Sequence, residues 1–178
     1  APLSPRQPGG NHRSLADQLR QDVAQNARKL GVVGDNLHLD GLDEDAVDLV
    51  GMLFDVMFDE RDFEEGSRTL ISRLVVPFVK AAVMDRRLFL YKTHPARRLL
   101  NSLAEACEGN RGEGPQEREL LQKAESTVDR LIAEFNEDIA IFETLEQELR
   151  AFLDQHRRRV ELAERRAAEA QRGQERLE

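Results

Sequence analysis

The chain contains no proline and no glycine between Gln116 and Arg172, and this stretch is far longer than an average helix. Apolar residues recur along it at steps of three and four, which is the spacing of one helix face. A single helix over 116–171 would be roughly 80 Å long at 1.5 Å per residue, longer than a compact domain of this size. The spacing is near a heptad repeat, so the distal half is predicted to pair with another helix. The stripe consists of Leu121, Ala124, Val128, Leu131, Phe135, Ile139, Phe142, Leu145, Leu149, Phe152, His156, Val160 and Ala163.

Shorter helical patterns precede this stretch. The first begins at the candidate N-cap Ser14 and runs to Leu30, and the residues from Gly31 to Gly41 are predicted to form a loop. The next pattern follows Asp43, which we expect to cap the helix. Its apolar residues recur at helical spacing, so that face is predicted to be core. They are Ala46, Leu49, Val50, Leu53, Phe54, Met57 and Phe58.

Pro77 interrupts a further apolar stripe that extends from Phe63 to Val83. The stripe keeps its helical phase across Pro77, so we expect a kinked helix. In such a helix the carbonyl of Arg73 loses its amide partner, because proline has no amide hydrogen. A break of the helix at this point is the alternative.

A last short helix is predicted to begin at Pro95, in the first helical position, and to end at Gly109. Two glycines and a proline follow it within residues 110–115. The predicted fold class is all-α, with a small domain of about four helices followed by a long C-terminal helix that can form a coiled coil. The predicted parts are a flexible tail (1–13), the helical domain (14–109), a linker (110–115) and the long amphipathic helix (116–178).

The overall charge limits the classes of partner. A formal net charge of -8 argues against binding along nucleic acid or against an anionic membrane. No apolar run approaches the roughly 20 residues that span a bilayer. With one cysteine no internal disulfide can form, and no secretory signal is recognisable. We therefore expect a cytoplasmic protein with no membrane partner. Its ends, without an initiator Met and with a final Leu177-Glu178, predict a fragment of a longer protein.

No residue pattern indicates a reaction centre. None of the four histidines has a glutamate three residues before it, as a diiron site in a helical bundle requires. Asp48, Asp55 and Asp59 share one helix face, and a solvated acidic face explains this better than a metal site does. Cys107 lies on an apolar stripe and is predicted to be a buried thiol rather than a nucleophile. We expect no enzyme activity, no cofactor and no metal.

Cations gather before and within the helix that begins at Pro95. Arginine can bind a phosphate or carboxylate with two parallel hydrogen bonds, and a helix N-terminus favours anions. In the alternative interpretation, which we favour, these arginines pair inside the domain with carboxylates such as Asp59, Glu60 and Asp62. The candidate anion-binding residues are Arg86, Arg87, Lys92, Arg97 and Arg98, with Phe89, Tyr91 and His94 among them.

Acidic residues precede basic residues along the predicted long helix. An antiparallel pair of two copies that crosses near Arg150 would place Glu143 opposite Arg157 and Glu134 opposite Arg166. A solvated helix with ion pairs between residues four apart is equally compatible with the sequence.

Three segments resemble those of a bacterial family of unknown function, whose longer members are often labelled thymidine phosphorylase. They are Asp48–Glu60, Leu74–Lys80 and His94–Asn101, and the resemblance extends over residues 43–106. It implies a cytoplasmic regulatory or scaffold protein of several segments. Phosphorolysis of a nucleoside needs a phosphate-binding glycine loop in an α/β fold, whereas this sequence predicts no strands alternating with helices.

We expect a non-catalytic regulatory or scaffold module that binds a protein partner, or a second copy, through the long helix. Replacing Leu149 and Phe152 with Asp would then abolish association and leave the small domain folded. The alternative is a module that senses a phosphate-bearing ligand, such as a nucleotide or cyclic dinucleotide, through the cluster from Arg86 to Arg98. The predicted partner-binding residues are Phe142, Leu145, Leu149, Phe152, His156 and Val160.

Overall fold

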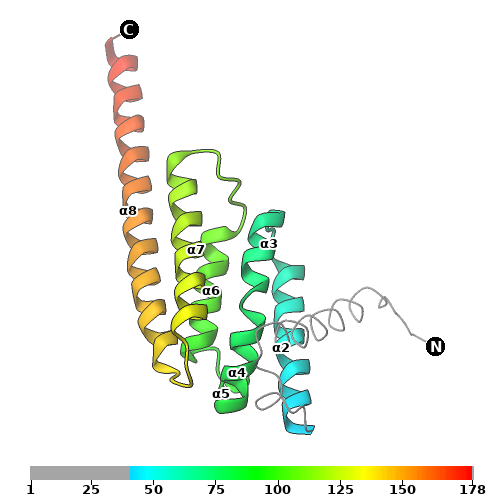
Figure 1. The fold of residues 1–178 in the computed structure, drawn as a ribbon. Coiled ribbons are helices and arrows are strands. Elements are labelled where there is room, and N and C mark those ends of the chain that lie inside the picture. Colours follow the sequence, from blue (N-terminus) through cyan, green and yellow to red (C-terminus); the bar gives the residue numbers. More distant parts are fainter. Residues whose placement is uncertain (1–40, 178) are drawn as a thin grey trace, which may run out of the picture.

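The computed structural model describes residues 41–177, which form helices joined by short loops (Figure 1). The predicted all-α class is confirmed for these residues. The predicted tail (1–13), the predicted helix (14–30) and residues 31–40 lie outside the described part. The helices are α2 (Gly41–Glu60), α3 (Glu65–Ser72), α4 (Val75–Met84), α5 (Arg87–Leu90), α6 (Pro95–Cys107), α7 (Pro115–Glu134) and α8 (Ala140–Leu177).

The stripe that carries Pro77 forms two helices, α3 and α4, so the prediction of one kinked helix is wrong and the alternative of a break is correct. Between them, the amides of Arg73 and Leu74 donate to carbonyls three residues back, at 3.1 and 2.9 Å. Pro77 then lies in the first turn of α4. The missing amide hydrogen is tolerated there, because the first amides of a helix have no acceptor within the helix.

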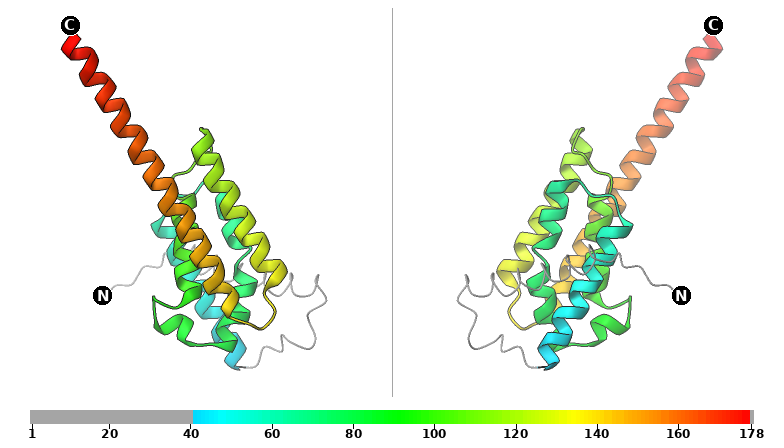
Figure 2. Two further views of the ribbon diagram at one scale, coloured as in Figure 1. Left: turned by 90° about the vertical axis from the view of Figure 1, so that its left-hand side faces the viewer. Right: turned by 90° about the vertical axis from the view of Figure 1, so that its right-hand side faces the viewer.

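The stretch from Gln116 to Arg172 is not one helix, so the prediction of a single long helix over 116–178 is wrong. It forms α7 and α8, which fold back on one another (Figures 1 and 2). Between them Glu137 adopts a left-handed backbone with a φ of 64°. The carboxylate of Asp138 then accepts a hydrogen bond from the amide of Ala140 at 3.0 Å, which caps the start of α8.

A row of phenylalanine rings joins α2, α4 and α8 at the centre of the bundle. Phe54 meets Phe78, and Phe78 meets Phe142, in each case edge to face with 5.5 Å between ring centroids. Phe135, just after α7, meets Phe142 at 5.2 Å. Phe54, Phe78 and Phe142 have no exposed surface. The first half of α8 is therefore part of the core rather than an appendage to it.

Residues 110–115 connect two helices of the same bundle, because α6, α7 and α8 pack against one another. Asn110 is buried in this loop, and its side-chain amide donates to the carbonyls of Ala106 and Glu117. The predicted linker between a small domain and a separate helix is thus an internal loop. The division into a domain at 14–109 and a helix at 116–178 is wrong for the described residues.

Replacing Phe142 with Ala should lower the free energy of unfolding by about 3–5 kcal/mol, the usual cost of removing a buried phenylalanine. Phe152→Ala is the matched control, because Phe152 is half-buried, with Lys123 Nζ 5.7 Å from its ring centroid. We expect this variant to cost less than half as much. Urea unfolding followed by circular dichroism measures both, and equal costs would contradict the placement of Phe142 in the core.

Candidate functional site

The predicted basic cluster lies at the corner formed by the end of α4, the short helix α5 and the start of α6. Asp85 organises this corner: its two carboxylate oxygens accept hydrogen bonds from the guanidinium of Arg87, each at 2.8 Å. Nε2 of the buried His94 lies 3.1 Å from Asp85, and Nδ1 accepts from the amide of Ala96 at 3.1 Å. This pattern assigns the ring hydrogen to Nε2, facing Asp85. The Arg87 guanidinium holds the pKa of the Asp85 carboxyl well below its usual range.

Two further arginines of the cluster, Arg97 and Arg98, are engaged inside the domain. Arg97 donates to the carbonyl of Leu88 at 3.1 Å. Arg98 reaches across to α8, where its guanidinium lies 3.0 Å from the buried Glu146 and 3.3 Å from Glu143. The interpretation that the arginines pair with carboxylates inside the domain is therefore correct for Arg87 and Arg98, but the partners differ from those that we expected. The carboxylates are Asp85, Glu143 and Glu146, in place of Asp59, Glu60 and Asp62.

An anion at this corner would have to share most of its arginines with acceptors inside the chain. Arg87, Arg97 and Arg98 each hold an acceptor within the chain, and the amide of Ala96 is taken by the ring of His94. The other two members of the candidate set, Arg86 and Lys92, have exposed side chains. The candidate anion site thus brings its residues together, but chiefly as a clamp that joins α6 to the corner and to α8.

The predicted partner-binding residues on α8 divide into two groups. Phe142, Leu145 and Leu149 are at most 1% exposed, so the prediction that they bind a partner is wrong. The turn after α7 directs them into the core of their own bundle. Phe152 and His156 are half-buried at the edge of this core, as is Val160 further along α8. An aspartate at Leu149 would therefore unfold the domain, contrary to the expectation from the sequence.

The expected antiparallel pairing about Arg150 is likewise replaced by contacts within the chain. Arg150 donates to the hydroxyl of Ser102 at 2.9 Å, and Arg157 lies 2.8 Å from Glu105, both on α6. Glu143 pairs with Arg98, as described above. These contacts fix the first half of α8 to α6, so Glu143, Arg150 and Arg157 already have partners inside the chain.

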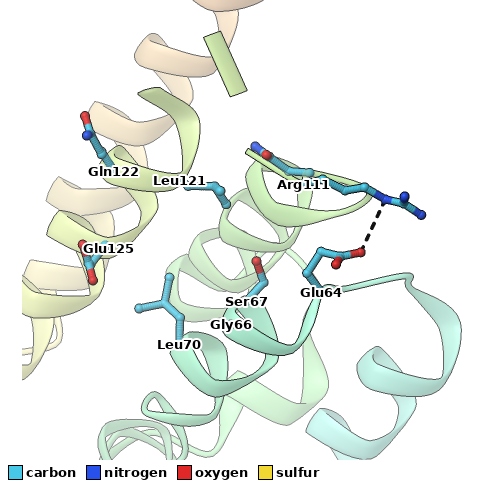
Figure 3. Close-up of a pocket in the computed structure, with 9 residues that line it drawn as sticks. Glu64, Gly66, Ser67, Leu70, Arg111, Leu121, Gln122 and Glu125 are labelled. Carbon is cyan, nitrogen blue, oxygen red and sulfur yellow. Dashed lines mark ion pairs between the residues drawn. The ribbon is translucent and has the colours of Figure 1, made fainter. Parts of the chain in front are cut away.

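A pocket of about 310 Å³ lies between α3, α7 and the loop after α6 (Figure 3). At its rim Arg111 and Glu64 form an ion pair at 3.6 Å. Below it, Ser67 hydrogen-bonds the buried Cys107, and burial raises the pKa of this thiol. A protonated, covered thiol is a poor nucleophile. The pocket is lined by Glu64, Gly66, Ser67, Leu70, Asn110, Arg111, Leu121, Gln122 and Glu125.

The acidic face of α2 differs from the expectation, because Asp55 is buried rather than solvated. Among residues 41–177, no group of three or more metal-binding side chains comes together. In the same residues, no helix is both long enough and apolar enough to cross a bilayer.

Residues 2–138 match the family described as "Protein of unknown function (DUF1631) 2nd domain". The chain belongs to this family. No curated protein and no solved structure matches the chain. The resemblance noted over residues 43–106 is thereby confirmed as membership of a family of unknown function. The DUF1631 match ends just before α8, although Phe142 on α8 completes the core of the bundle.

Asp85→Asn should lower the free energy of unfolding at neutral pH by about 1–3 kcal/mol, because Arg87 and His94 lose a charged acceptor. The folded state lowers the pKa of Asp85, so its contribution is complete above the usual aspartate pKa of about 3.9 and is lost as the pH falls below it. Unfolding measured from pH 7 to pH 2 should thus show a flatter acid limb in the variant. Glu169→Gln, on the exposed end of α8, is the control and should leave the limb unchanged.

Proposed function

We propose that this domain is a non-catalytic interaction module, a regulatory or scaffold unit of a cytoplasmic protein. In this proposal the bundle is a rigid base, and residues 161–177, here called the arm, pair with the arm of a second copy. The observation that carries the proposal is the exposure of the arm. Residues 161–176 are exposed throughout, although they continue α8 without a break (Figure 2).

The arm is a helix that its own bundle does not support. Arg159 lies 2.8 Å from Glu119 on α7 and anchors the base of the arm. The arm itself, residues 161–177, has 17 residues and extends for about 26 Å. Helices of this length are marginal in water when nothing packs against them. Pairing with another helix would stabilise the arm.

Small residues form a seam along the arm. Val160, Ala163, Ala167 and Ala170 follow heptad spacing, and alanine lets two helices approach closely. Val160 and Ala167 follow the buried Phe142 and Leu149 by 18 residues, which are five full helical turns, so this seam continues the core-facing side of α8 beyond the end of the bundle. The arm can therefore meet a partner while the first half of α8 stays packed on its bundle.

The charge of the arm favours a second copy as the partner. Residues 161–176 contain four glutamates and four arginines, so their net charge is zero in a chain whose net charge is -8. A neutral segment adds little to the repulsion between two copies of an acidic chain. Self-association through the arm is therefore compatible with the net charge of the chain.

The seam predicts different effects for two neighbouring alanines. Ala167→Glu places a charge in the seam and should weaken self-association at least about tenfold, because it brings two like charges together. Ala168→Glu makes the same substitution on the side of the helix away from the seam, and should leave association unchanged. Sedimentation equilibrium over a range of protein concentrations measures both. A wild-type chain that stays monomeric throughout, or equal behaviour of the two variants, would contradict the proposal.

Binding of a phosphate-bearing ligand at the corner has less support, because its arginines already hold acceptors within the chain. Titration calorimetry with a mononucleotide and with a cyclic dinucleotide should therefore give no heat of binding. Saturable heat that disappears in Arg97→Ala, but persists in the control Arg165→Ala on the arm, would favour the ligand-sensing alternative instead.

A further inference from the structure

The corner between α4 and α6 exposes apolar side chains as well as cations. Leu90 is 71% exposed and Tyr91 is 55% exposed, whereas Leu88 in the same short helix has no exposed surface. Met84, at the end of α4, is 43% exposed. Residues 84–92 are called the corner tip below. An isolated exposed leucine is ordinary, but neighbouring apolar side chains at one protruding corner indicate a contact surface.

The charge of the corner tip is opposite to that of the whole chain. Residues 84–92 contain two arginines, one lysine and one aspartate, which give a local net charge of +2. The side chain of Arg87 is 71% exposed even though it pairs with Asp85. That pairing uses two of its five N–H groups, so three remain for an outside acceptor. Lys92 is exposed next to Tyr91.

The corner tip lies at the end of the bundle opposite the free end of α8 (Figure 1). The pocket described above is formed by other elements, between α3 and α7. Apolar side chains that project from a helix end can enter a flat, deformable surface without needing a groove. A lipid interface has this property, and its anionic phosphates would meet the cations beside the apolar residues.

We propose that the corner tip binds the surface of an anionic phospholipid membrane. Leu90 and Tyr91 enter the headgroup region, while Arg87 and Lys92 bind lipid phosphates. The expectation of no membrane partner came from the net charge of the whole chain, whereas membrane attraction depends on charge within about 10 Å of the surface. The contact is peripheral, and it leaves the arm at the opposite end accessible.

Co-sedimentation with vesicles tests the proposal. The wild-type chain should sediment with phosphatidylcholine vesicles that contain about 30% phosphatidylglycerol and not with pure phosphatidylcholine, since the attraction is to anionic lipid. Leu90→Asp should weaken binding more than about tenfold, and Lys92→Gln about fivefold, given the usual contributions of apolar burial and of one basic residue. Leu162→Asp is the matched control, because Leu162 is also an exposed leucine, 44% exposed, but lies on the arm. It should bind like the wild type.

Glycerol phosphate at matched ionic strength distinguishes a lipid surface from a site for free phosphate, and should not displace the protein from the vesicles. Failure of the wild-type chain to sediment with anionic vesicles would overturn the proposal. Equal binding by Leu90→Asp and the wild type would also overturn it. Complete displacement by glycerol phosphate would reassign the corner to a soluble phosphate ligand. Circular dichroism checks that each variant is folded, which we expect because the substituted residues are exposed.

Discussion

The contact between Phe78 and Phe142 determines how the chain is organised. It joins α4, from the middle of the sequence, to α8, and both rings are fully buried. Without it, α2 to α6 would have an uncovered apolar face, and no buried aromatic contact would hold α8 against the bundle. The interhelical ion pairs follow from this placement. Arg98 meets Glu146, and Arg157 meets Glu105, only because α8 already lies along α6.

Local signals in the sequence were sufficient to predict a helix end where a single proline or glycine determines the backbone conformation. Pro95 begins α6 and Gly109, with a φ of 67°, follows its end, as predicted. The turn after α7 escaped prediction because Asn136, Glu137 and Asp138 contain neither glycine nor proline. The apolar spacing also continues across them, since both helices face the same core. Asn and Asp in succession were the available signal, because both residue types favour turns.

The chemistry of the corner was predictable in kind but not in detail. Arginines this close to a core need acceptors, so pairing inside the domain could be expected. Which carboxylates they meet depends on the position of α8, which the sequence predicts to lie outside the domain. Asp85 directly precedes Arg86 but is not part of the predicted cluster, because its bond to His94 is a tertiary contact. Nothing in the spacing of Leu90 or Tyr91 distinguishes an exposed side chain from a buried one.

Because α8 is continuous, the rotation of the arm about the helix axis is fixed relative to the bundle. One unbroken helix leads from Phe142 in the core to the free end of the arm, so the bundle and the arm cannot rotate independently. Each residue added to or removed from α8 between them would turn the arm by about 100° and shift it by about 1.5 Å. Seven added residues would nearly restore the original direction at a greater distance. The number of residues between His156, at the edge of the core, and the seam of the arm thus sets the orientation of a bound partner relative to the bundle.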